Sequence, residues 1–559
     1  MDSATPPLAP LASLTGEQRA QLEDTPPGDR LELLATWLAE PGETLLPRLA
    51  AAAGLPPDPA TAADPDALRD FPARILLEYC VAPVGPAADG AVTLACAWPP
   101  DAVMRDWLAT FTTRPLRWCL APAPRIRQLL HEQHGIGAGS LDDVSGPDAA
   151  PGEAGHQLGD EDTDAATITF VREILAQALK EGATDVHFEP QEKQLRIRYR
   201  IDGILVAMPV PPSLSRYRDA IISRLKIMAR LNISERRQPQ DGRFSFRVGP
   251  NLVDVRISTL PTVHAESVSL RLLNRTVASY TVASLGLGEA ELRLVRQVID
   301  FPHGIVLLTG PTGSGKSTTL NAFLQELNSA ELRLVTIEDP IEFDLPGANQ
   351  VQLRPEIDFT FASALRHVLR QDPDVIMVGE IRDRETAEIA IRASLTGHLV
   401  FSTLHTNDAP GAITRLVDMG IEPFLVTSGL QLVIAQRLVR RLCPRCARPA
   451  PVDRRALRDT LATLGVDPAE ADTIDTLPVA VGCEHCRQTG YRGRLGIFEL
   501  FRVDHTLHDA ILAGQTSAEL GRLARQQGMR PLGAAGWARV RAGETTADEL
   551  RRTIMAQDR

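Results

Sequence analysis

The sequence has few aromatic residues and no long uncharged apolar run. Phe, Trp and Tyr together make up 4% of the 559 residues, and the formal net charge is -12. Proteins that thread single-stranded nucleic acid combine a basic groove with aromatic stacking platforms, so a nucleic-acid translocase is disfavoured. No apolar run reaches the length of a membrane span, and the start MDSATPPLAP lacks the basic and apolar regions of a secretory signal. We therefore expect a cytosolic chain.

Cysteine is also scarce, and its spacing is informative. Of the seven cysteines, Cys80, Cys96 and Cys119 lie apart in apolar surroundings and are expected in the core. The other four form two C-x-x-C pairs separated by 36 residues, namely Cys443 with Cys446 and Cys483 with Cys486. In a reducing compartment, paired knuckles of this kind indicate one tetrahedral zinc site with four thiolate ligands. A redox pair or a chance spacing is the alternative.

The chain is too long for one hydrophobic core, and composition predicts its divisions. Residues 1–138 read as a small N-terminal α/β domain. Residues 139–164 are rich in Gly, Pro, Asp and Ser and read as a flexible linker. A second N-terminal domain is expected over 165–280, where QLRIRYRIDGIL predicts a β-hairpin. Alternating strand and helix patterns over 281–559 predict a doubly wound parallel sheet with an insert at 440–490.

The stretch TGPTGSGKST matches the phosphate-binding pattern G-x-x-x-x-G-K-[ST]. An apolar strand pattern precedes it and a helical pattern follows, as phosphate binding at a helix N-terminus requires. Lysine then reaches the β and γ phosphates, and the serine hydroxyl binds Mg²⁺. The predicted nucleotide-binding residues are Gly310, Pro311, Thr312, Gly313, Ser314, Gly315, Lys316, Ser317 and Thr318.

Carboxylates follow two further apolar strands. TIEDPIEF contains Glu338, Asp339 and Glu342, and DVIMVGEIRD contains Glu380. Carboxyl ends of parallel strands lie where the loop holds its phosphates, so one of these groups can organise Mg²⁺ and another can act as general base. The residues alone leave the two roles of Glu342 and Glu380 open. Asp374 precedes its strand and is expected at the opposite edge of the sheet.

Two histidines and one basic run complete the candidate set. His398 and His405 flank an apolar strand in TGHLVFSTLHTNDA, which favours a γ-phosphate sensor over a histidine of the core. The run QRLVRRLCPRCARP is the one basic cluster. We expect it to belong to the zinc knuckle and to face a protein or the membrane surface.

Four of these stretches, GPTGSGKSTTL, TIEDPIEF, LRQDPDVIMVGEIRD and TGHLVFSTLHTNDA, resemble in order and spacing the Walker A, Asp box, Walker B and His box of the secretion ATPase superfamily. The resemblance runs from about residue 165 to the C-terminus. It implies a RecA-like P-loop NTPase core, a preceding PAS-like α+β domain and ATP hydrolysis with Mg²⁺. It also implies Glu342 as general base, Glu380 as the Walker B residue, and arginines supplied to the nucleotide by the second domain, for which Arg243, Arg256 and Arg271 are the candidates.

The resemblance further implies a cellular role. Retraction motors of pili typically lack both the tetracysteine insert and an extended N-terminal region, and this chain has both. It is similar to the assembly motors, which are the type II secretion ATPases and, as the alternative, the type IV pilus extension ATPases. Such a motor is a homohexamer at the inner face of the inner membrane. It reaches the membrane through partners, namely a platform protein and the cytoplasmic domain of a membrane-anchored assembly protein. The resemblance implies that the first N-terminal domain, residues 1–138, docks on the cytoplasmic part of the platform protein.

Overall fold

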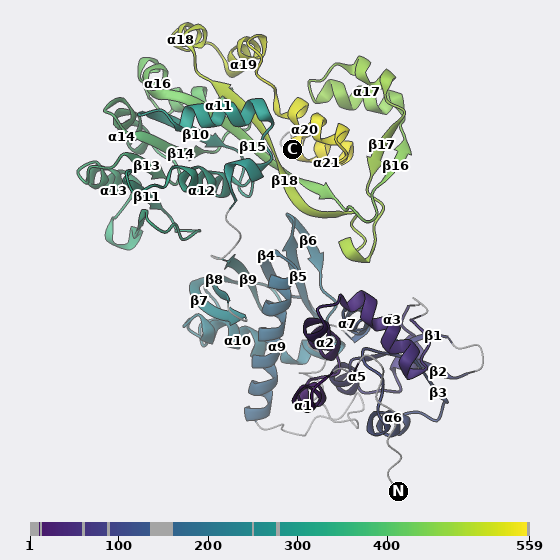
Figure 1. Cartoon of the computed structure of the whole chain (residues 1–559). Coiled ribbons are helices and arrows are strands. Elements are labelled where there is room, and N and C mark those ends of the chain that lie inside the picture. The colour runs from purple at the N-terminus through teal and green to yellow at the C-terminus, as the bar shows by residue number, and fades with distance from the viewer. Residues whose placement is uncertain are drawn as a thin grey trace. The chain divides into compact units, whose positions relative to one another are not determined.

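The computed structural model describes residues 11, 14–58, 62–86, 90–134, 160–248, 251–274 and 280–555. The chain forms two compact units, Met1–Leu273 and Asn274–Arg559 (Figure 1). The predicted linker lies outside the described residues up to 159, and its last five residues belong to helix α9, which begins at Asp160.

The first part of the first unit is built on a three-stranded sheet with its own hydrophobic core. Strand β2 pairs antiparallel with β1 and parallel with β3. Cys80, Cys96 and Cys119 are buried in this core, as predicted. The elements are α1 (Gly16–Asp24), α2 (Arg30–Leu38), α3 (Gly42–Ala53), α4 (Pro65–Leu68), α5 (Ala73–Tyr79), β1 (Val81–Pro86), β2 (Val92–Cys96), α6 (Ala102–Ala109), β3 (Leu116–Leu120) and α7 (Ala123–His134).

The second part of this unit is a six-stranded sheet in the order β6-β5-β4-β9-β8-β7. The hairpin predicted from QLRIRYRIDGIL is confirmed, with Asp202 and Gly203 at positive φ in the two-residue turn between β5 and β6. Apolar side chains of alternate strand positions pack with α9 and α10, which leaves the other face of the sheet polar. The elements are α9 (Asp160–Lys180), β4 (Ala183–Pro190), β5 (Leu195–Ile201), β6 (Ile204–Ala207), η2 (Pro212–Tyr217), α10 (Arg218–Met228), β7 (Gln240–Val248), β8 (Asn251–Pro261) and β9 (Glu266–Asn274).

The second unit contains the predicted parallel sheet. Its seven strands run in the order β12-β11-β13-β14-β10-β15-β18, and the six from β12 to β15 are parallel, whereas β18 runs antiparallel to β15. The strands are β10 (Gly304–Thr309), β11 (Leu334–Glu338), β12 (Asn349–Gln352), β13 (Val375–Val378), β14 (Leu399–Leu404), β15 (Leu430–Leu442) and β18 (Tyr491–Arg502).

Helices cover both faces of this sheet. On β10, Ile305 and Leu307 pack in one core cluster, and Val306 and Leu308 pack in another, which explains the unbroken apolar run of the strand. The helical elements around the sheet are η3 (Val282–Leu285), α11 (Glu289–Ile299), α12 (Lys316–Leu327), η4 (Pro355–Ile357), α13 (Phe361–Val368), α14 (Arg384–Leu395), α15 (Pro410–Asp418), α16 (Pro423–Gly429), α18 (His505–Leu512) and α19 (Ser517–Gln526).

The predicted insert lies between β15 and β18. Its helix α17 shares a hydrophobic cluster with Val439 of β15 and with the C-terminal helices α20 and α21. No helix among the described residues combines the length and apolar character that a membrane span requires. The elements of this region are β16 (Arg448–Pro451), α17 (Arg454–Thr463), η5 (Pro468–Thr473), β17 (Thr476–Val479), η6 (Glu484–Cys486), α20 (Leu532–Arg541) and α21 (Ala547–Met555).

Candidate functional site

The predicted phosphate-binding loop connects the end of β10 to the first turn of α12, with Gly315 as the helix N-cap. Gly310 adopts φ 147°, and a Cβ built there would lie 2.6 Å from the Gln436 carbonyl oxygen. Only glycine therefore fits where the loop leaves the strand. Free N–H groups at the start of α12 and the positive end of its dipole favour an anion at this place.

Lys316 lies over this loop. Its Nζ donates hydrogen bonds to the carbonyl oxygens of Gly310 at 2.6 Å and Pro311 at 3.2 Å. Burial lowers the pKa of Lys316 to about 8; Glu380 and Glu342 oppose this shift, and Arg437 adds to it. The ammonium group is thus close enough to both predicted carboxylates to feel their charge, although they come from separate strands.

The residues present fit a nucleotide phosphate. The hydroxyl of Ser314 is buried and has no hydrogen-bond partner among the described residues, so it is available to a group held inside the loop. Ser317 is exposed at the first turn of α12, where a hydroxyl can bind the Mg²⁺ that accompanies ATP. Pro311, Thr312 and Gly313 are exposed along the rim of the loop.

Glu380 follows the fully buried strand β13, and its side chain is 19% exposed. It pairs with Arg382, and its Oε2 lies 3.4 Å from Nε2 of His405. Burial favours a raised pKa for Glu380, but Arg382 and His405 outweigh it and hold the pKa below its ordinary value. A carboxylate that stays ionised suits binding of Mg²⁺ and water better than proton abstraction.

The Asp box carboxylates differ in their surroundings. Glu338 is half-buried and accepts hydrogen bonds from Thr336 at 2.7 Å and Gln350 at 3.2 Å. Burial raises the pKa of Glu338, and its two hydrogen bonds only partly offset this effect. Glu342 is exposed, four residues beyond the end of β11. Its exposed side chain can change conformation to reach a water molecule, as a general base must.

The two histidines lie at opposite ends of β14. His405 follows the strand and contacts Glu380, whereas His398 precedes it and bonds the Ala393 carbonyl through Nδ1 at 2.9 Å. Its own carbonyl receives the N–H of Gly304 at the start of β10. The expectation of a phosphate-sensing pair is therefore wrong for His398, because a strand of six residues separates it from the carboxyl edge.

Sequence reasoning missed the contribution of β15. Gln436 and Arg437, 2% and 3% exposed, lie beside the loop just beyond the last β10–β15 pair. Gln436 Oε1 accepts from Thr319 of α12 at 2.8 Å. The assignment of the whole basic run to a protein or membrane surface is thus wrong for this part. The signal available was the apolar strand pattern LQLVIA leading directly into QR, which places both residues at a carboxyl edge.

The three candidate arginines share the polar face of the six-stranded sheet. Arg243 on β7 pairs in register with Arg256 on β8. Arg271 on β9 donates through Nε to Asp185 of β4 at 3.0 Å. The alternating neighbours Phe244, Val255 and Leu270 are buried on the other face, so the three guanidinium groups belong to one side.

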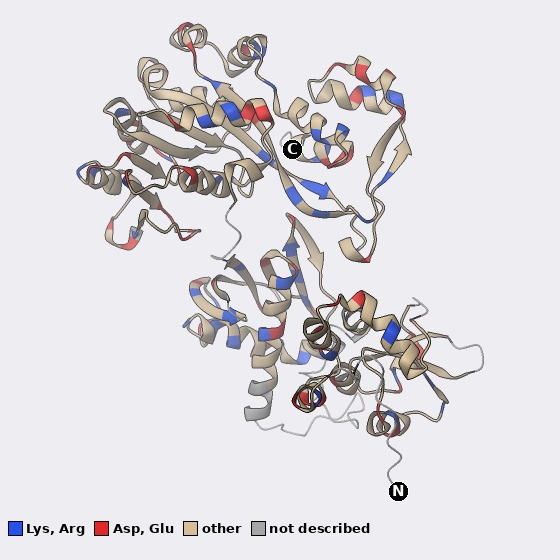
Figure 2. Cartoon of the chain, viewed as in Figure 1, with Lys and Arg blue, Asp and Glu red and all other residues tan. Residues whose placement is uncertain are grey.

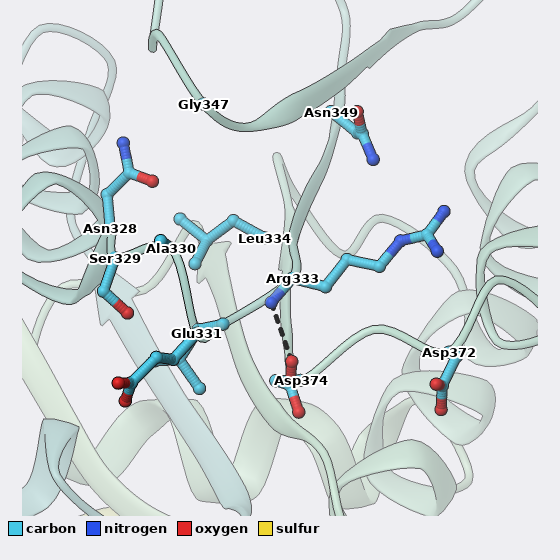
Figure 3. A pocket seen from close by; sticks show the side chains of 11 residues that line it. Asn328, Ser329, Ala330, Glu331, Arg333, Leu334, Gly347, Asn349, Asp372 and Asp374 are labelled. Carbon is cyan, nitrogen blue, oxygen red and sulfur yellow. Dashed lines mark hydrogen bonds between the residues drawn. The ribbon is translucent and has the colours of Figure 1, made fainter.

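The opposite edge of the parallel sheet holds an open cavity of about 670 Å³ (Figure 3). It is lined by residues that precede β11 and β13, among them Glu331, Arg333 and Asp374. Asp374 Oδ2 accepts from the N–H of Arg333 at 2.7 Å. The predicted placement of Asp374 is confirmed, and this cavity is separate from the P-loop.

The four paired cysteines converge. All four sulfur atoms lie within 4.8 Å of one another, and three of the S–S distances are 3.7 to 3.8 Å. A tetrahedron with Zn–S bonds of about 2.3 Å has edges of about 3.8 Å, so the group fits zinc. Burial raises the pKa of Cys486. The backbone nitrogens of Cys483 and Gly490, each 3.2 Å from Cys486 Sγ, outweigh burial together with the Cys446 and Cys483 thiols and lower this pKa to about 7.

Metal analysis should find about one zinc per chain, because four thiolates complete one tetrahedral shell. Cys443→Ser should weaken binding and expose residues 440–490 to protease, while ATP binding at the P-loop persists. Cys119→Ser, at a buried cysteine outside the cluster, is the matched control and should retain the metal. Metal-free protein with a protease-resistant insert would contradict the zinc assignment.

Comparison with known proteins assigns the chain to a family. Residues 160–552 match the family model described as type II/IV secretion system protein, and residues 54–136 match the MshEN domain. The chain is 48% identical over 414 residues to the type II secretion system protein E of Pseudomonas aeruginosa, covering 74% of this chain and 80% of that protein. It is 42% identical over 496 residues to the type IV pilus assembly ATPase PilB of Myxococcus xanthus, covering 87% and 86%.

A solved structure shares the fold. The Legionella pneumophila ATPase DotB superposes with a TM-score of 0.50 at 22% sequence identity, covering 69% of this chain and 95% of that one. The P-loop, Asp box, Walker B and His box residues meet at one edge of the parallel sheet within the matched region, with the tetracysteine insert between β15 and β18. The relative PilB and the solved structure DotB are both named as ATPases, and the chain belongs to the type II/IV secretion system protein family.

Proposed function

We propose that this chain is the hexameric, cytoplasmic ATPase that powers type II protein secretion by driving pseudopilus assembly through an inner-membrane platform. The observation that supports ATP turnover is the convergence of Lys316, Glu380 and Glu342 at the carboxyl edge of the sheet, with His405 on Glu380. Relatives named type II secretion system protein E or ATPase E, from several organisms, are 47% to 50% identical to the chain. Type IV pilus assembly remains the second candidate because PilB covers more of the chain.

Phosphates bind against the start of α12 and draw Lys316 away from the carbonyl groups of Gly310 and Pro311. The hydroxyl of Ser317 and the carboxylate of Glu380 would hold Mg²⁺, and the ion would supply positive charge to the phosphates. Glu342 accepts a proton from the attacking water. No covalent intermediate is required, since phosphoryl transfer to water depends mainly on positioning and charge stabilisation.

The second N-terminal domain completes the site in this proposal. Arg243, Arg256 and Arg271 lie on one polar face, and closure of this face over the nucleotide brings positive charge to the γ phosphate. Hydrolysis removes that attraction and opens the domain. Subunits that alternate around a ring turn this motion into displacement of the membrane platform.

Glu342→Gln should bind ATP with nearly normal affinity and lose about 10²- to 10⁴-fold in phosphate release, because an amide cannot accept the proton of water. Glu380→Gln should instead weaken Mg²⁺-dependent binding as well as turnover, since its carboxylate is ionised. Both effects can be read from phosphate release and from titration with a fluorescent ATP analogue. If Glu342→Gln turns over ATP normally and Glu380→Gln does not, Glu380 is the general base.

The cellular role can be tested by deleting the gene in its host. We expect exported enzymes to accumulate inside the cells while surface pili and twitching motility persist. Complementation with the intact gene should restore export, and complementation with Lys316→Ala should fail. Normal export with loss of pili would identify the chain as the pilus assembly ATPase.

A further inference from the structure

Arg437 is a buried charge that the catalytic proposal above does not use. It lies on β15, 3% exposed, and its side chain touches two segments that are distant in the sequence. A Cβ added to Gly310 would lie 2.9 Å from Arg437 Nη1, so the guanidinium packs against the first residue of the P-loop. Its Nη2 donates a hydrogen bond of 2.6 Å to the carbonyl oxygen of Asn407.

Asn407, which accepts this hydrogen bond, belongs to the His box. Asn407 is two residues beyond His405, which contacts Glu380. Between them, Thr406 exchanges hydrogen bonds with Thr309, the last residue of β10: its N–H donates to Thr309 Oγ1 at 2.8 Å, and the two hydroxyl oxygens are 2.6 Å apart. The P-loop and the His box therefore meet at two adjacent links, one through Thr309 and one through Arg437.

Glu499 of β18 extends the same connection. It is 5% exposed, and its two carboxylate oxygens accept the N–H of Ala409 at 2.9 Å and of Leu532 at 3.1 Å. Ala409, the last residue of the His box, caps α15, and Leu532 is the first residue of α20. The charges of Glu499 and Asp408 favour the ionised form of Arg437 and partly offset its desolvation.

Helix α20 in turn contacts the insert. Its second residue, Gly533, lies so close to α17 that an added Cβ would be 2.0 Å from the Leu464 carbonyl oxygen. Trp537 and Val540 of α20 share a cluster with Leu457 and Leu461 of α17. A displacement at the first turn of α20 therefore reaches helix α17 of the insert through direct packing.

We propose that Arg437 is a positioning residue of the nucleotide site, which holds the His405–Asp408 segment against the start of the P-loop and, with Glu499, couples loop occupancy to α20. Phosphate binding moves the carbonyl of Gly310 as Lys316 leaves it. Because Arg437 packs on that residue and is bonded to Asn407, the shift passes to the Ala409 cap and then through Glu499 to Leu532. The inference rests on the proposed ATP site.

The test uses full-length protein and compares wild type with Arg437→Lys. Arg437 donates through Nη1 to the Gln436 carbonyl at 2.9 Å and through Nη2 to the Asn407 carbonyl. Lysine keeps the charge but cannot span both carbonyl groups as a guanidinium does. Amide hydrogen exchange is measured at residues 405–411 and 530–535, with and without Mg²⁺ and a non-hydrolysable ATP analogue. In the wild-type protein, amide exchange in both segments should slow at least about threefold when the analogue binds. In Arg437→Lys this slowing of exchange should be absent, and kcat should fall about 10- to 100-fold. The affinity for the analogue should change less than about threefold.

Arg440→Lys is the matched control, because Arg440 lies on the same strand but pairs with buried Glu549 and stacks on Tyr491. It should lower thermal stability and retain the exchange response. Should Arg437→Lys fail to fold, Glu499→Gln provides a second test, since an amide oxygen can accept only one of the two N–H groups. It should leave the response at 405–411 and abolish it at 530–535.

The possible results distinguish failure of the proposed coupling from failure of the proposed ATP site. A wild-type response that persists in Arg437→Lys, or one that persists at 530–535 in Glu499→Gln, would overturn the coupling. Tight binding by wild type without any response at 530–535 would also overturn it. Failure of wild type to bind the analogue would instead contradict the proposed ATP site.

Discussion

Lys316→Ala should reduce ATP turnover by about 10³-fold or more, below detection in most assays of phosphate release. Lys316 is the one side-chain cation of the P-loop motif and lies within the influence of Glu380 and Glu342. Without it, the charge that develops on the β and γ phosphates has no counterpart inside the loop. Since burial lowers the pKa of free Lys316 to about 8, ATP affinity of the unaltered protein should also fall as pH rises through that value.

The chain supplies a simple control, because it contains only four lysines. Lys193 is exposed in the turn between β4 and β5, and Lys193→Ala should retain normal turnover. Circular dichroism and thermal unfolding would verify that both variants fold. Turnover of Lys316→Ala near that of the control would refute the assignment of the nucleotide site.

The isolated segment from residue 281 onward should bind ATP and hydrolyse it about 10³- to 10⁵-fold more slowly than the full chain. This is the range by which an arginine supplied to a phosphoryl transition state commonly raises the rate. The segment keeps the core clusters on both faces of the parallel sheet, so its fold and its P-loop should survive. Phosphate release and analogue titration, at concentrations that populate rings, would measure the two properties separately.

Two controls localise the deficit. Removal of residues 1–138 alone should preserve basal turnover while it abolishes co-sedimentation with membranes that contain the platform. Within the polar face, Arg243→Ala should reproduce part of the loss, and Arg247→Ala, four residues further along the same strand, should not. Equal activity of the segment from residue 281 would remove the arginine proposal, and undiminished membrane recruitment without residues 1–138 would remove the docking proposal.

The sequence predicted those parts of the site whose signals are local. Strand β10, the loop and helix α12 follow from one apolar run, the glycines and one helical pattern, and the structure confirms all three. The β5–β6 hairpin likewise depends on one dipeptide at positive φ. The cysteines could be grouped because zinc chemistry specifies both ligand type and spacing.

The parts that escaped prediction depend on contacts between distant residues. Gln436 meets Thr319 across 117 positions, and Arg437 meets Asn407 across 30. Their role follows from β15 lying next to β10 in the sheet, and strand order is not written in any local pattern. Arginines of a basic run are ordinarily expected to be exposed to solvent. Arg437 is buried instead, and this could not be predicted without knowing its partners.

Strand β15, which carries Arg437, extends well beyond its pairing with β10. The last residue of β15 paired with β10 is Ala435, and β15 continues to Leu442 with only β18 beside it in the ladder. Those seven further residues, at about 3.3 Å each, carry the ribbon about 23 Å from the sheet edge toward the cysteines. In Figure 2, positions occupied by Lys or Arg colour parts of this ribbon blue. A rotation of about 10° at its base would move the tip by about 4 Å at this strand rise. By this geometry alone, an ångström-scale displacement near the base of the ribbon corresponds to a displacement several times larger at its end, next to the four cysteines.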